Sequence, residues 1–272
     1  MIIISTRKKF TDPDHLCKKK VTKEIDLTVN IKDIKIPEEE LNDEELLNKL
    51  SNTRILIIVH GYNNNFKKTM ETYKKIYRNL KNDYDHIIGF MWAGGDHFVD
   101  YYTAKEKLYG VGHELRYVLN LLKENNKKVD IMAHSLGNVV VFDSLTPDSN
   151  EAIVNNFFSL AAAVDNNSLN EYGYYNKTLE NFKNIFICYS AKDSVTGFIR
   201  KTSDWDFKHG ALGHELPYDI DYFVSNDVHN VHFINCTEVV SRHGSYKKST
   251  EVYEFIRSVN NVNEITFTFK NL

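Results

Sequence analysis

The chain has 272 residues, of which 42% are hydrophobic and 26% charged, an ordinary globular composition with room for one α/β domain. Lysine and arginine number 34 against 37 aspartates and glutamates, and a net charge of −3 gives no indication of nucleic-acid or anionic-membrane binding. The longest apolar runs, such as Ile55–Val59, are far too short to span a bilayer.

The cysteines and the first residues of the chain bear on its compartment. Cys17, Cys188 and Cys236 are odd in number and widely spaced, so they predict neither a disulfide framework nor a zinc site. The apolar start, Met1–Ile4, is followed at once by basic residues, whereas a secretory signal has its charges first and a longer apolar region after them. We therefore expect a cytoplasmic protein without a transmembrane segment.

Strand-like and helix-like patterns alternate along the chain. Apolar or alternating runs predict strands at residues 2–5, 25–31, 55–59, 87–92, 129–132, 157–164, 185–189, 231–236 and 265–269. Apolar residues at helical spacing predict helices at residues 37–50, 66–80, 108–122, 136–145 and 245–259. Strands that alternate with helices imply a mostly parallel, doubly wound α/β sheet of about eight strands with helices on both faces.

One long segment does not fit this alternation. Residues 197–230 are aromatic, irregular and too long for a plain connection, so they form either a lid over a site or an excursion beside the sheet. In a parallel sheet, ligands gather at the carboxyl ends of the strands. That edge is expected to carry His60, Trp92, Ser135, Asp165 and Asp193.

The strongest local signal lies between Lys128 and Phe142. A short apolar strand there turns through Ala-His-Ser-Leu-Gly into an apolar helix, with Ser135 at the apex of the turn. A buried strand that turns sharply into a buried helix with serine at its apex is a nucleophile elbow, and Gly137 lets the helix start close to the strand. The pentapeptide alone also fits an ordinary strand-to-helix turn, and its flanks favour the elbow.

Two further motifs are expected at the same edge. One is His60-Gly61-Tyr62-Asn63-Asn64 after a buried strand, and the other is Trp92 at the end of the next strand. Together with the elbow they resemble an α/β-hydrolase, and in particular a little-characterised bacterial branch of that fold. The resemblance spans Ile55–Val259, with Ala133 where the elbow usually has glycine. It implies one α/β-hydrolase domain, residues 1–272, to which residues 1–53 add N-terminal strands and an acidic helix.

The resemblance also implies a triad in the chain order serine, acid, histidine. Asp193 follows the strand two after the elbow strand, which is the usual acid position, and Asp165, one strand earlier, is the alternative. His243, in the loop before the closing helix, is the expected base. The remaining histidines weighed for this role lie in the oxyanion loop, the elbow, the long segment and a strand: His60, His134, His209, His214, His229 and His232.

The rest of the expected site supports this triad. The backbone N–H groups of Leu136 and Tyr62 are placed to bind a tetrahedral oxyanion. Substrate contacts are expected from the neighbouring residues His60, Gly61, Trp92 and His134. The chemistry requires no metal and no cofactor, and His60, His134 and Asp165 do not have a recognisable zinc spacing.

These expectations lead to a serine hydrolase that acts on a small-molecule acyl substrate. Hydrolysis of a carboxylic ester is expected before a thioester or amide, because it demands least beyond the triad and the oxyanion hole. Two alternatives stay open: an acyltransferase that uses the same residues, and a catalytically idle α/β-hydrolase scaffold that acts as a binding module. The oligomeric state is not indicated by the sequence.

Overall fold

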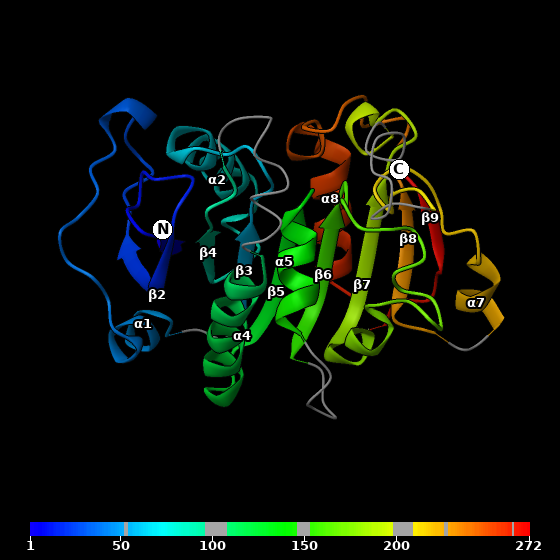
Figure 1. Cartoon of the computed structure of the whole chain (residues 1–272), viewed down its shortest axis with the longest axis horizontal. Coiled ribbons are helices and arrows are strands. Elements are labelled where there is room, and N and C mark those ends of the chain that lie inside the picture. The colour runs from blue at the N-terminus through cyan, green and yellow to red at the C-terminus, as the bar shows by residue number, and fades with distance from the viewer. Residues whose placement is uncertain (52–53, 96–107, 146–152, 198–208, 226–227, 263) are drawn as a thin grey trace.

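The structure is a computed structural model that describes residues 1–51, 54–95, 108–145, 153–197, 209–225, 228–262 and 264–272. Its centre is one sheet in the order β2-β1-β4-β3-β5-β6-β7-β8-β9, in which only the β1–β2 pair is antiparallel. The strands are β1 Ile2–Arg7, β2 Leu16–Glu24, β3 Arg54–Val59, β4 His86–Met91, β5 Lys128–His134, β6 Val154–Leu160, β7 Phe182–Tyr189, β8 Val231–Asn235 and β9 Phe269–Asn271. The predicted mostly parallel α/β sheet is confirmed (Figure 1).

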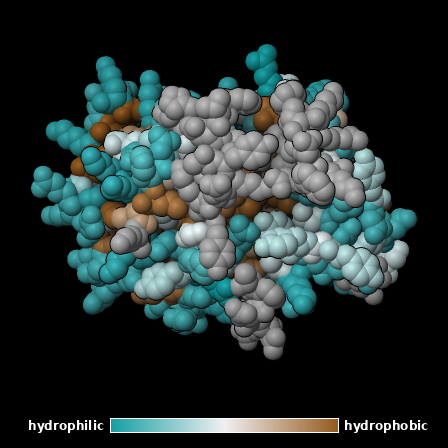
Figure 2. Space-filling view, in the orientation of Figure 1, coloured by the Kyte–Doolittle hydropathy of each residue, from teal (hydrophilic) through white to brown (hydrophobic). Residues whose placement is uncertain are grey.

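Helices cover both faces of this sheet. They are α1 Asp43–Lys49, α2 Phe66–Leu80, α4 Leu108–Glu124, α5 Gly137–Ser144, α7 Ile220–Ser225 and α8 Thr250–Asn260, with short 3₁₀ turns η1 Ile31–Asp33, η3 Asn176–Asn181 and η4 Tyr246–Lys248. In Figure 1, α4 and α5 lie in front of the sheet and α8 lies behind it. Figure 2 shows hydrophobic residues toward the middle of the front face and hydrophilic ones around them.

The core is divided by the sheet into two layers because strand side chains alternate between faces. In β3, Ile55, Ile57 and Val59 pack in the layer of α4 and α5, whereas Leu56 and Ile58 pack in the layer of α2 and α8. All five are at most 2% exposed. A strand buried on both faces explains the uninterrupted apolar sequence of β3.

Local chemistry fixes where the helices begin. The Asn65 side chain accepts from Lys68 N at the start of α2, and the Ser249 side chain accepts from Val252 N at the start of α8. At α1, Asn42 and Glu45 form a reciprocal capping box. These caps satisfy amide groups that have no partner inside a helix.

One predicted strand is wrong, and the last is displaced, since β9 is Phe269–Asn271 and residues 264–267 are not in a strand. Residues 25–31 do not form a strand, and the second strand is Leu16–Glu24, which the sequence analysis did not predict. Ile25 and Leu27 are buried against the layer of α2, and η1 packs on α2, so the alternation reflects one buried face of an irregular segment. Asp26 bends this segment by accepting from Thr28 N at 2.8 Å.

The strand ends meet at one edge of the sheet. Val59 pairs with Ala133, His134 with Leu160, and Tyr189 with Asn235, so the loops after β3, β5, β6, β7 and β8 emerge together. The sixth strand ends at Leu160 rather than at the predicted Val164, because Ala161 has φ +47° and leaves the extended conformation. No helix in the described part of the chain is long and apolar enough to cross a membrane.

Candidate active site

Ser135 stands at a strained turn between β5 and α5. Its φ is +56°, a left-handed conformation that costs a non-glycine residue free energy and persists only where the surroundings enforce it. Ser135 N donates to Leu160 O at 3.0 Å, which ties the turn to the end of β6. Its carbonyl accepts from Asn138 N at 3.0 Å and from Asn138 Nδ2 at 2.8 Å. The turn therefore has the geometry of a nucleophile elbow.

Two glycines allow the loops to approach this turn. A Cβ on Gly61 would lie 2.7 Å from His134 O and 2.9 Å from Ser135 Cβ, and a Cβ on Gly137 would lie 2.6 Å from His60 O. Neither position has room for a side chain. The loop after β3 is thus packed directly against the turn at Ser135.

Asp193 and His243 form a hydrogen-bonded pair, with His243 Nδ1–H donating to Asp193 Oδ2 at 2.8 Å. Asp193 is fully buried, and its Oδ1 accepts from the N–H groups of Val195 and Thr196. Burial raises the pKa of the Asp193 carboxyl, but the hydrogen bond and charge of His243 and the Thr196 N–H outweigh it, so the pKa lies below its usual value. Asp193 is therefore an ionised acceptor.

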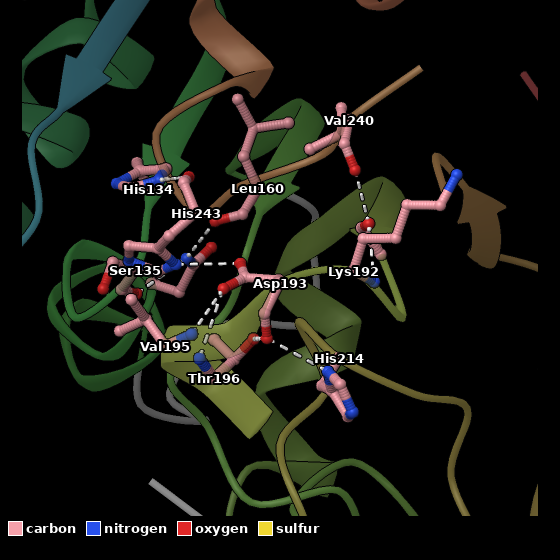
Figure 3. A network of polar contacts seen from close by, with 12 residues as sticks. His134, Ser135, Leu160, Lys192, Asp193, Val195, Thr196, His214, Val240 and His243 are labelled. Atoms are coloured by element: carbon pink, nitrogen blue, oxygen red, sulfur yellow. Dashed lines mark hydrogen bonds and ion pairs between the residues drawn. The ribbon is translucent and has the colours of Figure 1, made fainter. Parts of the chain in front are cut away.

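The three predicted triad residues are brought to one place. Ser135, His243 and Asp193 follow one another across the close-up in Figure 3. The elbow residue His134 contacts His243 directly, with 4.5 Å between the ring centroids. Within the described part of the chain, His243 Nε2 makes no hydrogen bond, so this nitrogen is open to a hydrogen-bond donor.

The alternative acid, Asp165, has other partners. Its Oδ1 accepts from Asn167 N at 2.9 Å and lies 3.2 Å from His209 Nδ1, and its Oδ2 accepts from His209 N at 3.2 Å. The side chain thus forms a turn and anchors the segment that begins at residue 209. It makes no hydrogen bond to His243 among the described residues.

Two other histidines are held by backbone carbonyls. His214 Nδ1 donates to Asp193 O at 3.2 Å, so it contacts the main chain of Asp193 and not its carboxylate. His232 is buried in β8 and donates from Nδ1 to Phe267 O, as expected of a core histidine. Neither occupies the position of a base.

The expected oxyanion donors belong to the residue after Ser135 and to the loop that packs against it. Leu136 directly follows Ser135 at the N-terminal cap of α5, and in the described part of the chain its N–H has no acceptor. The loop that carries Tyr62 is folded by Asn64, whose Nδ2 donates to Gly61 O and Tyr62 O at 3.0 and 2.7 Å. Backbone amides next to a helix N-terminus favour a developing negative charge.

His60 and Trp92 are buried at 2% and 0% exposure, which does not fit the substrate contact expected of them. His60 Nδ1–H donates to Gly61 O at 2.7 Å, and its Nε2 accepts from Trp92 N at 3.1 Å. The indole stacks on the imidazole, and its Nε1–H donates to His60 O. Burial, followed by the charge of Arg7, lowers the pKa of His60 to about 3. We assign both residues to holding the loop.

Sequence reasoning missed Arg7, the last residue of β1. The residue is 1% exposed, and it donates from Nε to Trp92 O at 2.9 Å and from Nη2 to Asn64 O. It thereby ties the N-terminal strand to the end of β4 and to the loop after β3. The sequence did offer one signal, a charged residue at the end of an apolar strand. Where such a residue is a buried arginine, it needs specific acceptors.

Part of the segment 197–230 packs on the carboxyl edge of the sheet. Leu212 N donates to Val164 O and Gly213 N to Ala162 O, both at 3.0 Å, and Ser190 N donates to Gly213 O. These bonds hold residues 211–213 against the carboxyl ends of β6 and β7. Residues 198–208 and 226–227 lie outside the described part of the chain, so the expectation of a lid stays a prediction. No group of three or more metal-ligating side chains occurs among the described residues.

Comparison with known proteins agrees with the fold. The family model described as Alpha/beta hydrolase of unknown function (DUF900) matches residues 37–194, more than half of the chain. The match takes in the loop after β3, the elbow and Asp193, and it ends before His243. No curated protein matches the sequence. Among solved structures, the product of the gene lin2722 from Listeria innocua has a TM-score of 0.50 and 10% identity over 81% of this chain and 99% of that one, a likeness of fold alone.

Proposed function

The chain belongs to this family of α/β-hydrolases of unknown function, and from that premise we propose that it is a serine hydrolase. It cleaves a carboxylic ester, or the related thioester or amide, through an acyl-enzyme on Ser135. The observation that carries the proposal is the 2.8 Å hydrogen bond from His243 to the buried Asp193, at the edge where Ser135 occupies a strained turn. A buried aspartate paired with a histidine is what a serine needs for activation.

In the proposed reaction, Ser135 Oγ attacks the substrate carbonyl carbon while His243 Nε2 accepts the hydroxyl proton. The C=O electron pair moves onto oxygen, where the Leu136 and Tyr62 amides stabilise it. When the carbonyl re-forms, the bond to the leaving group breaks, and the leaving oxygen takes the proton from His243. Water then repeats the sequence, releasing the acid and restoring Ser135.

Asp193 acts through His243 in both halves of this cycle. It keeps the proton on Nδ1, so that Nε2 is the nitrogen that accepts from serine. It also stabilises the imidazolium that forms when the serine proton arrives. Because its pKa lies below the usual value, Asp193 carries this negative charge throughout the neutral pH range.

A fluorophosphonate probe followed by mass spectrometry tests the proposal. We expect one adduct, on Ser135, and no labelling of Ser135→Ala. Ser144→Ala is the matched control, because Ser144 is a buried serine of α5 whose Oγ donates to Val141 O, away from the turn. It should label like the natural protein. An adduct on Ser190 or Ser241 would contradict the assignment, and a folded protein that does not label would favour an idle scaffold.

A panel of activated esters of increasing acyl length identifies the reaction. Turnover in water alone is expected for a hydrolase. If turnover requires an added alcohol or amine, and the product carries the acyl group on that acceptor, the protein is an acyltransferase instead. Ser135→Ala serves as the inactive control in both assays.

A further inference from the structure

We propose that His134 is a positioning residue that sets the base beside the nucleophile, by donating a hydrogen bond from its Nε2 to the main-chain carbonyl of His243. The proposal rests on the proposed serine hydrolase function and adds a role for the residue that precedes the nucleophile. His134 does not touch the reacting atoms in this role. It acts through His243.

The contact is short and well defined. His134 Nε2 lies 2.7 Å from His243 O, and the two rings are 4.5 Å apart at an angle of 54°. Tyr246 closes the other side of the His134 ring at 6.4 Å, edge to face. Figure 3 shows the bond reaching from the elbow across to the loop of His243.

The tautomer of His134 follows from its partner. A carbonyl oxygen only accepts, so Nε2 carries the proton and Nδ1 does not. Burial, followed by the charge of His243, lowers the pKa of His134 to about 3, so the ring is uncharged near neutral pH. A neutral ring matters here, because a second positive charge 4.5 Å away would oppose the formation of the His243 imidazolium.

The surroundings of His134 preserve this state. The ring lines a cavity of about 30 Å³ together with Thr72 and Lys247. Lys247 Nζ donates to Thr72 Oγ1 at 2.9 Å, and burial lowers the pKa of this lysine below its usual value. Neither the Lys247 ammonium nor the Thr72 hydroxyl carries a negative charge that would stabilise a second proton on the ring.

The loop that carries His243 needs this support. Its residues 241–245 are all exposed or half-buried. The nearest anchors are Ser190 Oγ, which donates to Val240 O, and Ser245 N, which donates to Arg242 O. Among the hydrogen bonds of the described residues, the one from His134 is the only one that reaches the His243 main chain.

This arrangement ties the base to the nucleophile through a single residue. Ser135 is covalently bonded to His134, and His134 holds the backbone of His243, while Asp193 holds its ring. The base is thereby fixed at two points, and one of them belongs to the same strand end as the serine. A base displaced by about 1 Å loses roughly 10²-fold in rate.

Substitutions at His134 test the role by comparing donors of different reach. In His134→Leu the donor is gone, and kcat for an activated ester should fall about 10- to 100-fold with little change in KM. In His134→Gln the amide nitrogen reaches the place of Nε2, so kcat should recover to within about fivefold of the natural protein. His134→Asn places its nitrogen too far back and should stay slow.

The matched control is His232→Leu, which removes a buried histidine that likewise donates to a backbone carbonyl, that of Phe267, away from the site. It should lose stability but keep kcat and the rate of probe labelling. If His134→Leu does not fold, the Gln and Asn variants decide: a faster Gln supports the proposal.

Equal rates for Gln and Asn, or a folded His134→Leu with natural kcat, would overturn the proposal while leaving the hydrolase intact. A natural protein that neither turns over esters nor labels would overturn the proposed function, and this role with it.

Discussion

An aspartate is buried at the edge of the sheet where the strands start, the amino edge, and another at the edge where they end, the carboxyl edge. The two carboxylates differ in what surrounds them. Asp130 lies near the start of β5, at the amino edge, and Asp193 follows β7 at the carboxyl edge. Both are 0% exposed. Burial of a carboxylate is costly unless it is hydrogen-bonded, so both need donors, and the kind of donor separates their roles.

At the amino edge the donors hold Asp130 in place. Tyr84 OH, Asn155 Nδ2 and Asn156 N donate to it at 2.7–3.0 Å, and Arg54 lies 3.8 Å away. Burial and the charge of Asp130 raise the pKa of Tyr84 well above its usual value, so the phenol stays protonated and keeps donating. None of these groups exchanges a proton near neutral pH. This cluster joins the starts of β3, β5 and β6.

At the carboxyl edge one donor of Asp193 is an imidazole. A histidine can pass a proton from one ring nitrogen while the other remains bonded to the carboxylate. In the proposed mechanism, the same buried group therefore stabilises structure at one edge and supports proton transfer at the other. The difference lies in the neighbour, since the burial is equal.

The largest expected difference between the edges is in turnover. Asp193→Asn should lower kcat about 10⁴-fold, because an amide leaves His243 in the wrong tautomer. Asp130→Asn should keep kcat within about threefold but lower the free energy of unfolding by about 1–3 kcal/mol, through mispaired buried donors. Ester turnover and urea unfolding measure the two effects. Asp165→Asn is the control at the carboxyl edge, and its kcat should stay near that of the natural protein. If Asp165→Asn loses kcat and Asp193→Asn does not, the acid is Asp165.

The next largest expected difference between the edges is in how strongly each lowers the stability of the fold as the pH falls. Burial lowers the pKa of His60 and of His134 to about 3, against about 6.5 in an unfolded chain. Between these values the unfolded state binds protons that the folded state lacks, so stability is lost as pH falls from about 6.5 toward 3. Each histidine contributes a slope of about 1.4 kcal/mol per pH unit in that window.

Urea unfolding of His134→Gln at pH 6.5, 5.5 and 4.5 should therefore give a flatter pH dependence than the natural protein. His86→Gln is the control at the amino edge, because burial lowers the pKa of this half-buried histidine too, but by less than that of His134. Its effect on the slope should be smaller. An unchanged slope for His134→Gln would mean that His134 is not held neutral by the fold.

The sequence predicted most of the carboxyl edge because its signals are local. The elbow needs a buried strand, small residues and a buried helix within fifteen residues, and all are legible in Lys128–Phe142. The expected acid and base, Asp193 and His243, follow from chain order in the fold that the sequence resembles. The structure places them 2.8 Å apart.

What the sequence did not predict depends on contacts between distant residues. Arg7 is separated by 85 positions from Trp92, whose carbonyl it binds, and a charge at the end of an apolar strand does not say which distant residues it contacts. The strand Leu16–Glu24 was missed because it is an edge strand rich in lysines, which blur the alternation. The bond from His134 to His243 spans 109 positions.

The smallest expected difference concerns backbone strain at the two ends of β5. Asn126, in the turn before the strand, and Ser135, after it, both have φ +56°. Asparagine tolerates this conformation, whereas serine is strained in it by about 1–2 kcal/mol. Glycine removes the strain but costs about 0.5–1 kcal/mol in unfolded-state entropy. Ser135→Gly should therefore raise the free energy of unfolding by about 0.5–1 kcal/mol while abolishing turnover.

Asn126→Gly should have no stabilising effect, and Ala161→Gly, at φ +47° on the same edge, should stabilise without abolishing turnover. Urea unfolding of the three variants measures the contrast. If Ser135→Gly is no more stable than the natural protein, the turn is not strained, and the nucleophile is held at no cost to the fold. If it is more stable, the carboxyl edge stores strain at the residue that reacts, as functional sites do, and the amino edge of the same strand does not.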